Sequence, residues 1–541
     1  MEHGFLSILS PSYLGRNLRN LLYANPLYGL TLKGGTPERL RLTPPTFRFG
    51  NPETGRKIIS GIFTLSHHHI KLGKEPWNNK LSNPEQLADL HGFSWLTDLC
   101  AVGTDGARSL GCHLLADWID RNKKWQDFSW RPDILGERLS TWLYCFDFLS
   151  ATEKETQSIL LKMSMIQARH LVRSCSQAPN DARLFKAIQG LIFAAVCLPG
   201  AESTIETSLN RLNSAIGQQI LPDGGHFERN PSLALEILSR FNQIKDLLLA
   251  AHIEIPIQLQ GAIDRIPPML RALRLGDGCL TQFNGGYEAE RNLIDTVLAN
   301  SGVRGKPLTS APHSGFQRLA AGKTLIVVDT GKPVASERLN SHAGTLSFEM
   351  SHGKDRFVVN CGTPNSEGQK WLSALRVTAA HSTLSVDDLS SSQFDKRGLV
   401  LGPGTVECRR SEAEGAVWLE TSHDGYLDRI GITHKRKLFL DASGEDFRGE
   451  DLVEGSKGNN YTIRFHLHPS VQVQQSHGLR TILLKLFRGI GWKFQASEGT
   501  ICVKESVYLN GKNEPKRSNQ IVISGRLVGG STKINWRFYK C

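Results

Sequence analysis

The chain has 541 residues, of which 40% are hydrophobic and 21% are charged, and this composition excludes both a single small module and a disordered protein. Its 64 lysines and arginines exceed its 52 acidic residues, and the resulting formal net charge of +12 attracts polyanions. The longest uninterrupted apolar run, residues 191–198, is too short to span a bilayer. These features admit nucleic acid, anionic lipid or an acidic polysaccharide as the partner.

The start of the chain and its cysteines bear on the cellular compartment. Residues 1–9 contain no basic segment, only a short apolar run and no small-residue cleavage site, so the sequence predicts no secretory signal and a cytoplasmic protein. The ten cysteines form no CxxC pair, a spacing typical of neither a zinc ribbon nor a disulfide scaffold. We expect free thiols, most of them buried.

Helical periodicity dominates the first part of the chain. Residues 1–83 are interpreted as an N-terminal extension, in which residues 13–22 favour a helix and residues 37–53, rich in Pro, Thr and Arg, favour a loop or wrapping segment. From residue 84 to residue 293, apolar residues recur at helical spacing between Pro and Gly stops. At least seven or eight helices fit there, and we assign residues 84–305 to a helical domain.

The period of the apolar residues changes to two after about residue 312. Clusters of Gly, Asp and Asn separate many of the resulting short segments, which favours an antiparallel sandwich over a parallel sheet. The predicted fold class is therefore α+β multidomain, with residues 306–541 as the β domain. The segments expected to be strands are residues 324–329, 346–349, 356–359, 417–420, 437–440 and 463–467.

The densest cluster of reactive side chains lies in residues 223–231, just before a helical run at residues 234–249. Two glycines allow a tight turn, and His226, Glu228 and Arg229 follow within a few residues. Such a loop has the groups to bind a carboxylate and to move a proton. The alternative is a turn with a local Glu228–Arg229 ion pair and a buried, hydrogen-bonded His226.

Three further polar residues, His342, Asn360 and His381, lie at or beside predicted strand ends, where neighbouring strands bring side chains together. Two imidazoles and an oxygen donor are ligands that zinc accepts. The alternative is a hydrogen-bonded structural pair, which the wide separation of the two histidines in the sequence favours.

Arg464, His466 and His468 alternate with apolar residues, so on a strand they share one face. They either line a groove or form an outward polar face. Phosphate-binding glycine loops, GxSxG and HExxH motifs and nucleic-acid signatures are absent from the sequence, and its basic residues are dispersed rather than interleaved with aromatics. The sequence therefore argues against nucleic acid as the partner.

Taken in chain order, these residues resemble the heparinase II/III family of polysaccharide lyases, and the resemblance covers most of the chain. It implies that the helical domain is an (α/α) toroid, that the β domain is an antiparallel β-sandwich, and that a cleft between them holds the substrate. It also implies a bacterial cell-envelope or periplasmic setting, in conflict with the predicted cytoplasmic one. The most specific portions are residues 221–231 (LPDGGHFERNP), 341–362, 371–388 (WLSALRVTAAHSTLSVDD) and 461–469 (YTIRFHLHP).

Family members cleave uronic-acid-containing chains by β-elimination, which requires that the C5 carboxylate is neutralised, the C5 proton removed and the O4 leaving group protonated. In the family these tasks fall to an Asn-His pair, a Tyr and a His on the sandwich. Here the pair aligns with Asn180-Asp181, or two residues later with Ala182-Arg183. Leu233 stands where the Tyr is expected.

The sandwich motif departs from the family as well. The His-x-His that commonly precedes the LSFE strand is Asn340-Ser-His342 here, and a family Asp is replaced by Asn360, a weaker metal donor. His342 resembles one zinc ligand of the family and His381 another. The resemblance therefore implies a structural zinc ion in the sandwich, with His342, Asn360 and His381 as its ligands.

We predict a polysaccharide lyase that acts on an acidic, uronic-acid-containing polysaccharide or oligosaccharide. The alternative is a catalytically degenerate glycan-binding or envelope-polysaccharide assembly protein, which the loss of the tyrosine favours. The oligomeric state is open, although lyases of this architecture are sometimes dimers. The predicted catalytic residues are His226, Glu228, Arg229 and His342, and the predicted substrate-binding residues are Asn180, Asn230, Arg376 and His466.

Overall fold

The chain forms two compact units. The first comprises Met1–Gln218 and Arg240–Gln260, and the second comprises Gln219–Ser239 and Gly261–Cys541. The division passes through three helices and does not coincide with the boundary predicted after residue 305. The computed structural model describes residues 11–45, 50–66, 68–151, 154–335, 341–364, 369–395, 398–455, 457–475, 480–511 and 515–541.

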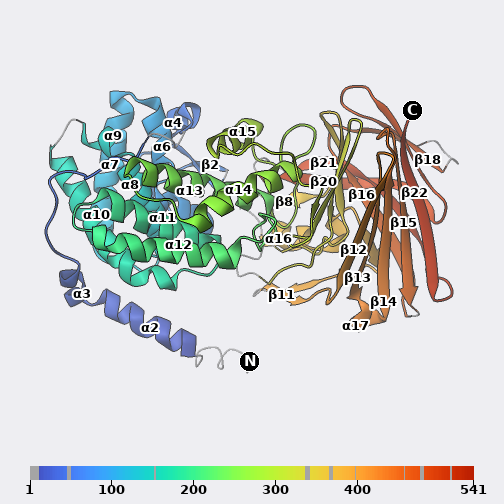
Figure 1. Cartoon of the computed structure of the whole chain (residues 1–541), viewed down its shortest axis with the longest axis horizontal. Helices are drawn as coiled ribbons and strands as arrows, with labels where there is room; N and C mark the ends of the chain where they lie inside the picture. The colour runs from blue at the N-terminus through green and yellow to red at the C-terminus, as the bar shows by residue number, and fades with distance from the viewer. Residues whose placement is uncertain are drawn as a thin grey trace. The chain divides into compact units, whose positions relative to one another are not determined.

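Helices build the first unit, drawn in blue to green in Figure 1, as the apolar periodicity predicted. A hairpin of β1 (Ile62–Leu65) and β2 (His68–Lys71) accompanies them. The helices from the start of the chain onward are α2 (Pro11–Ala24), α3 (Pro26–Thr31), α4 (Pro52–Ile59), α5 (Pro84–Gly92), α6 (Leu96–Val102), α7 (Asp105–Asn122), α8 (Pro132–Tyr144), α9 (Phe146–Ser150), α10 (Lys154–Ser174), α11 (Ala182–Cys197), α12 (Ile205–Gln219), α13 (Pro231–Ala250) and α14 (Ile257–Ala272).

Close backbone contact fixes the centre of the first unit. α11 is apolar on nearly all sides, which is typical of a helix buried in a core. A Cβ atom on Gly190 of α11 would lie 2.4 Å from the Cα atom of Gly136 on α8, so only glycines allow the two helices to approach this closely. Beside them, the Arg138 guanidinium lies 4.2 Å from the centroid of the Trp118 ring, where the aromatic face compensates its charge.

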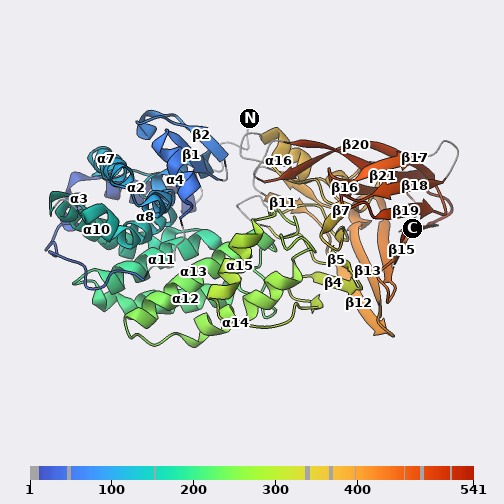
Figure 2. The same ribbon diagram turned by 90° about the horizontal axis from the view of Figure 1, so that it is seen from above.

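Strands build most of the second unit, and Figure 2 shows the same change from helix to strand from above. All six segments predicted as strands overlap strands of the structure. The helices are α15 (Arg291–Asn300), α16 (Gln369–Leu375) and α17 (Leu427–Ile430). The strands are β3 (Ser310–Ala311), β4 (Phe316–Ala321), β5 (Thr324–Asp329), β6 (Phe348–His352), β7 (Asp355–Val359), β8 (Gly362–Thr363), β9 (Leu384–Val386), β10 (Gln393–Asp395), β11 (Gly398–Leu401), β12 (Val406–Ala413), β13 (Ala416–Tyr426), β14 (Ile432–Leu440), β15 (Asp446–Gly455), β16 (Asn460–Leu467), β17 (Gln472–Gln475), β18 (Thr481–Lys485), β19 (Gly491–Ala496), β20 (Thr500–Asn510), β21 (Lys516–Arg526) and β22 (Ser531–Lys540).

Two large sheets form a sandwich. One has the strand order β12-β13-β14-β15-β22-β19-β18-β17, and the other has the order β3-β4-β5-β6-β7-β16-β21-β20-β8, with β9 paired to β16. Their pairs are antiparallel except for the short β20–β8 pair. Phe348 of the second sheet stacks on Trp536 of the first with ring centroids 5.9 Å apart, within one continuous apolar core. This confirms the predicted antiparallel sandwich.

The sequence predicted free, mostly buried thiols and no transmembrane helix. None of the ten cysteines forms a disulfide bond, but only four are buried, so the prediction that most of them are buried is wrong. The intermediate positions lie on partly exposed helices, strands and loops, where a small thiol needs no complete burial. None of the helices in the described part of the chain is both long enough and apolar enough to cross a membrane.

Candidate functional site

The loop at residues 223–231 is attached tightly to the second unit. Gly224 has φ +86°, and a Cβ atom there would lie 2.2 Å from the carbonyl oxygen of Arg265, so glycine is required. The Asp223 carboxylate accepts hydrogen bonds from the Ser314 backbone N–H at 2.7 Å and from the Ser314 hydroxyl at 2.5 Å. The tight turn predicted here therefore serves to join distant segments of the same unit.

His226 is buried, and both of its ring nitrogens have partners within the unit. Its Nδ1 atom accepts a hydrogen bond from the Glu228 backbone N–H at 3.3 Å. Its Nε2 atom lies 3.0 Å from the side-chain oxygen of Gln219, so that nitrogen carries the proton. Only 1% of His226 and 2% of Glu228 is exposed. This geometry matches the buried, hydrogen-bonded alternative; the catalytic roles of both residues remain predictions.

Arg229 holds the loop to the sandwich. Its guanidinium donates hydrogen bonds to the carbonyl oxygens of Ser314 at 2.7 Å, Lys332 at 2.9 Å and Gly315 at 3.1 Å, and it pairs with the buried Asp329 carboxylate. Arg229 therefore forms a buried ion pair with Asp329, and the local Glu228–Arg229 pair remains a prediction. Arg229 adopts the left-handed conformation, with φ +59°, and its side chain reaches Asp329 at the end of β5.

Asn230 caps α13. Its side-chain oxygen accepts hydrogen bonds from the Ser232 hydroxyl at 2.8 Å and the Leu233 backbone N–H at 3.1 Å, and its amide nitrogen donates to the Asn284 carbonyl at 3.0 Å. Leu233 is buried in the first turn of this helix. The position at which the resemblance expects a tyrosine is therefore occupied by an apolar core side chain.

The residues aligned with the family Asn-His pair lie in the first unit. The Asn180 amide nitrogen donates to the Gln218 side chain at 2.9 Å. Asp181 caps α11 and forms an ion pair with Arg183 at 2.6 Å. Their predicted roles remain untested, and Asn340 lies outside the described residues.

The clearest polar cluster lies around His342, which is 3% exposed. Its Nδ1 atom lies 3.2 Å from Nε2 of His381, and Nδ1 of His381 lies 2.8 Å from the Val377 carbonyl oxygen. A carbonyl only accepts, so Nδ1 of His381 carries a proton and its Nε2 accepts the Nδ1–H of His342. When hydrogen bonds link the pair in this way, Nε2 of His342 presents an unprotonated lone pair.

The electrostatics of the pair support this protonation state. Burial lowers the pKa of His342 well below its ordinary value, and His381 and Arg376 lower it further. Burial also lowers the pKa of His381 to about 4, although its hydrogen bond to Val377 opposes the change. Both imidazoles are therefore neutral at pH 7.

Arg376 lies against the same segment. Its Nε donates to the Ser341 carbonyl at 3.0 Å, and its guanidinium lies 4.1 Å from the centroid of the Phe394 ring. Its Nη2 atom is buried and has no hydrogen-bond partner among the described residues, and the same holds for Nε2 of His342 and for Nδ2 of Asn360. Buried polar atoms without partners are rare in folded proteins and often mark a ligand site.

The predicted zinc set fits these positions only in part. Zinc–nitrogen bonds are about 2.0–2.1 Å long, so two imidazole nitrogens 3.2 Å apart can also share one tetrahedral zinc ion. The Asn360 side-chain oxygen, however, already accepts the Ser382 backbone N–H at 3.0 Å. Across the described ranges, no group of three or more His, Cys, Asp or Glu residues is arranged to hold a metal. The described donors do not complete a structural zinc site, and zinc remains a prediction.

His466 does not lie on an outward polar face of its strand. It is 3% exposed, with Nε2 3.0 Å from the Ala379 carbonyl and Nδ1 2.8 Å from the Ser506 hydroxyl. Burial lowers its pKa to about 3. Because this face of β16 packs against neighbouring segments, the outward polar face is wrong for His466, and its predicted substrate contact is untested.

A buried charge network escaped the sequence analysis. Arg356 is 2% exposed and pairs with Asp277 at 2.6 Å, Glu288 at 3.5 Å and Glu349 at 3.7 Å, and the Tyr508 hydroxyl donates to Glu288. Burial raises the pKa of Glu349 to about 7, an effect that Arg356 opposes. No local motif marks this network, because its members come from distant segments of the chain.

Two family models match the chain. The model described as "Heparinase II/III N-terminus" matches residues 67–301, and that described as "Heparinase II/III-like, C-terminal" matches residues 303–537. The chain is 31% identical over 531 residues to "FtsZ-localized protein C" of Caulobacter vibrioides (strain NA1000 / CB15N), an alignment that covers 93% of this chain and 91% of that protein.

Solved structures share the fold. The crystal structure of heparinase III has a TM-score of 0.76 at 14% identity, with 96% of this chain and 89% of that chain covered. The heparan sulfate lyase HepC from Pedobacter heparinus has a TM-score of 0.62 at 16% identity, with 92% of this chain and 84% of that chain covered. The predicted class, an N-terminal (α/α) toroid followed by an antiparallel β-sandwich, is therefore confirmed.

Proposed function

Because the chain belongs to the heparinase II/III family of polysaccharide lyases, we propose that it cleaves an acidic, uronic-acid-containing glycan by β-elimination. The family supports lyase chemistry and an acidic polysaccharide substrate, and the net charge of +12 favours an anionic ligand. Within the chain, one observation carries the proposal: Nε2 of His342, Nη2 of Arg376 and Nδ2 of Asn360 are buried and have no hydrogen-bond partner among the described residues.

These atoms have the chemistry that β-elimination needs. The Arg376 guanidinium is a donor that matches a uronate carboxylate and neutralises its charge. The lone pair on Nε2 of His342 accepts the C5 proton while the C4–O4 bond breaks and a C4=C5 double bond forms. The imidazolium then returns this proton to O4, and the Asn360 amide donates to a substrate oxygen. His381 holds the tautomer of His342 through the 3.2 Å hydrogen bond.

The test is ultraviolet absorbance of the unsaturated uronate product. The purified chain is incubated with heparin, heparan sulfate, hyaluronan, alginate and polygalacturonate in separate reactions. We expect product from at least one glycan, with losses of at least 100-fold in His342→Gln and Arg376→Gln. His313→Gln changes an exposed histidine of the same unit and serves as the matched control. Absence of product from every glycan, or full activity in His342→Gln, overturns the proposal.

The second candidate is a glycan-binding or envelope-polysaccharide assembly protein without catalysis. It is favoured by the buried, hydrogen-bonded state of His226 and Arg229 and by Leu233, which cannot transfer a proton. It predicts binding of an acidic glycan without any rise in absorbance. The same incubations, combined with a binding measurement, decide between the two candidates.

The cellular setting is a proposal that rests on the Caulobacter relative. Its printed name states that it is FtsZ-localized, and at 31% identity over 93% of this chain we propose the same localisation here, with an envelope glycan as the substrate. A fluorescent fusion of the full chain, imaged together with FtsZ, tests this. Uniform fluorescence throughout the cell contradicts it.

A further inference from the structure

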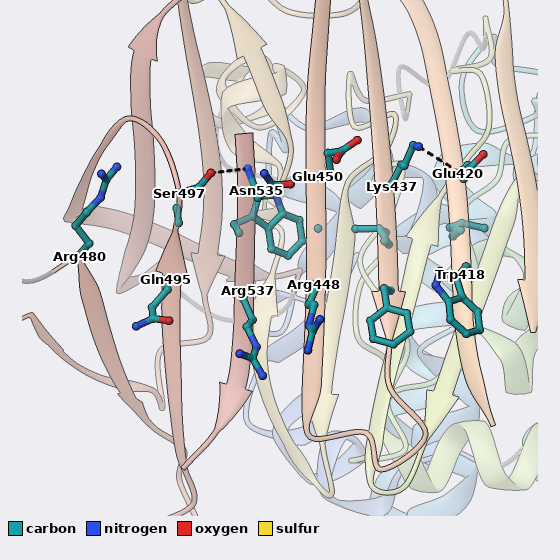
Figure 3. A pocket seen from close by; sticks show the side chains of 16 residues that line it. Trp418, Glu420, Lys437, Arg448, Glu450, Arg480, Gln495, Ser497, Asn535 and Arg537 are labelled. Carbon is teal, nitrogen blue, oxygen red and sulfur yellow. Dashed lines mark hydrogen bonds and ion pairs between the residues drawn. The ribbon is translucent and has the colours of Figure 1, made fainter. Parts of the chain in front are cut away.

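The outer face of the eight-stranded sheet carries a groove of about 660 Å³ (Figure 3). It lies within the second unit, on strands β13, β14, β15, β22 and β19, and contains none of the residues around His342. The inner face of this sheet contributes to the apolar core of the sandwich. The groove is therefore a surface separate from that core, lined by both aromatic and charged side chains.

Five of its residues form one row across the sheet. Trp418 is directly opposite Phe439, Phe439 opposite Arg448, Arg448 opposite Arg537, and Arg537 opposite Gln495. Figure 3 shows Trp418, Arg448, Arg537 and Gln495 following one another in this order. Strands in a sheet are about 4.8 Å apart, so the row extends over about 19 Å. That length suits an extended chain of several sugar rings rather than a small ion.

The aromatic end of the row is open. Trp418 is 38% exposed, so more than a third of its surface is available to a ligand. Its centroid lies 5.0 Å from that of Phe439, with the ring planes at 46°. As a cross-strand pair, Trp418 and Phe439 contribute to the stability of the sheet. The remaining exposed indole face offers an apolar platform for the C–H face of a sugar ring.

The centre of the row is cationic and held in place. The Asp446 carboxylate accepts hydrogen bonds from Nε and Nη2 of Arg448 at 2.9 and 2.6 Å, and from Nε and Nη2 of Arg537 at 2.6 and 2.8 Å. The two arginine side chains are 56% and 42% exposed. Asp446 thus fixes both guanidinium groups, which lowers the entropy cost of binding a ligand, while both side chains remain partly exposed.

A second row beside the first contains Glu420, Lys437 and Glu450 and is nearly neutral. Lys437 lies 3.4 Å from Glu420, and Glu450 lies 3.1 Å from Lys533. Its charges therefore compensate one another, whereas two arginines share one carboxylate in the first row. The excess positive charge lies beside the aromatic platform, which matches a ligand that combines apolar faces with anionic groups.

We propose that this groove is a second, non-catalytic binding site for an acidic oligosaccharide. Trp418 stacks on a sugar ring, and Arg448 and Arg537 bind its carboxylate or sulfate groups. The inference rests on the proposed substrate class but not on cleavage. Such a site retains a long glycan on the protein between encounters with the residues around His342.

Isothermal titration calorimetry on the full chain tests the proposal. The His342→Gln background prevents turnover, and the ligands are a galacturonate hexamer, a heparin-derived hexasaccharide and the neutral cellohexaose. We expect Trp418→Ala and Arg537→Gln each to weaken binding of an anionic hexamer at least tenfold. Arg517→Gln removes the same charge from a side chain that is 87% exposed on β21 of the other sheet, and we expect it to change binding less than twofold.

The outcomes separate the two proposals. Binding of the galacturonate hexamer alone assigns carboxylate as the anionic group, and binding of the heparin fragment alone assigns sulfate. Equal affinity in Trp418→Ala, Arg537→Gln and Arg517→Gln overturns the groove proposal, as does equal binding of cellohexaose. Groove-dependent binding by a chain that yields no unsaturated product leaves this inference intact and rejects the lyase. Circular dichroism melts of each variant confirm folding.

Discussion

Replacement of Arg229 distinguishes a structural from a catalytic role for the loop at residues 223–231. Arg229→Met keeps the apolar stem but removes three hydrogen bonds to carbonyl oxygens and the cation that faces Asp329. Both partners of the ion pair are nearly fully buried. Removing one partner of a buried pair costs about 3–5 kcal/mol because the other charge is left uncompensated.

The pH dependence of this loss has a definite sign. Burial raises the pKa of Asp329 even in the presence of Arg229, which opposes the rise. Without the guanidinium this pKa rises further, so the folded variant holds a proton that its unfolded chain releases above a pH of about 4. Stability contributed by that proton is present at low pH and is lost as the pH rises through the folded-state pKa. The destabilisation is therefore smaller at pH 5 than at pH 8.

Urea unfolding at the two pH values measures the effect, and Asp329→Asn in the Arg229→Met background is the control. We expect the second change to recover much of the loss, because it removes the uncompensated carboxylate. A loss below about 1 kcal/mol, or one that is independent of pH, refutes the reasoning. If Arg229 only holds the loop, the activity per folded molecule of Arg229→Met remains unchanged. If Arg229 instead binds the substrate carboxylate, this variant loses activity without losing stability.

Three further predictions follow from the described contacts. Gly190→Ala forces α11 away from Gly136 of α8, so we expect it to lower the thermal midpoint of unfolding. In Gly217→Ala in α12 the new Cβ meets no atom within 4 Å, so this variant raises the midpoint slightly. Equal midpoints for both variants contradict the close approach of α11 and α8. Because the pKa of Glu349 is raised to about 7, the folded state holds a proton that the unfolded chain releases above a pH of about 4.5. This group therefore favours the folded state by about 3 kcal/mol less at pH 7 than at pH 4.5, and urea unfolding shows whether Glu349→Gln abolishes this pH dependence of stability. Because no group of three or more His, Cys, Asp or Glu residues in the described part of the chain is arranged to hold a metal, we expect chelation to leave the melting temperature unchanged. Bound zinc together with a drop of several degrees contradicts this.

Local pattern explains what was predicted correctly about the fold. Helical spacing in residues 84–293 and period-two alternation after residue 312 arise from the geometry of each element, so a single sequence shows them. The turn at Gly224 was equally visible, because a tight turn needs glycine at that position. The resemblance to the heparinase II/III family then supplied the toroid and the sandwich, which local periodicity alone does not identify.

The two proposed sites depend on contacts between distant residues, and these contacts were decided by the tertiary structure. The sequence presents His226 and Arg229 as reactive loop residues, whereas the structure buries both and gives Arg229 partners such as Ser314 and Asp329. The hydrogen bond from His342 to His381 joins residues 39 positions apart and sets the tautomer that exposes a lone pair.

The groove on the eight-stranded sheet left no motif in the sequence, because each of its five strands contributes one residue to the row. The sequence by itself determined which segments become helices and strands, since those choices depend on neighbours along the chain. Which side chains remain unpaired, share a carboxylate or face solvent was decided only when strand pairing placed distant residues a few ångströms apart.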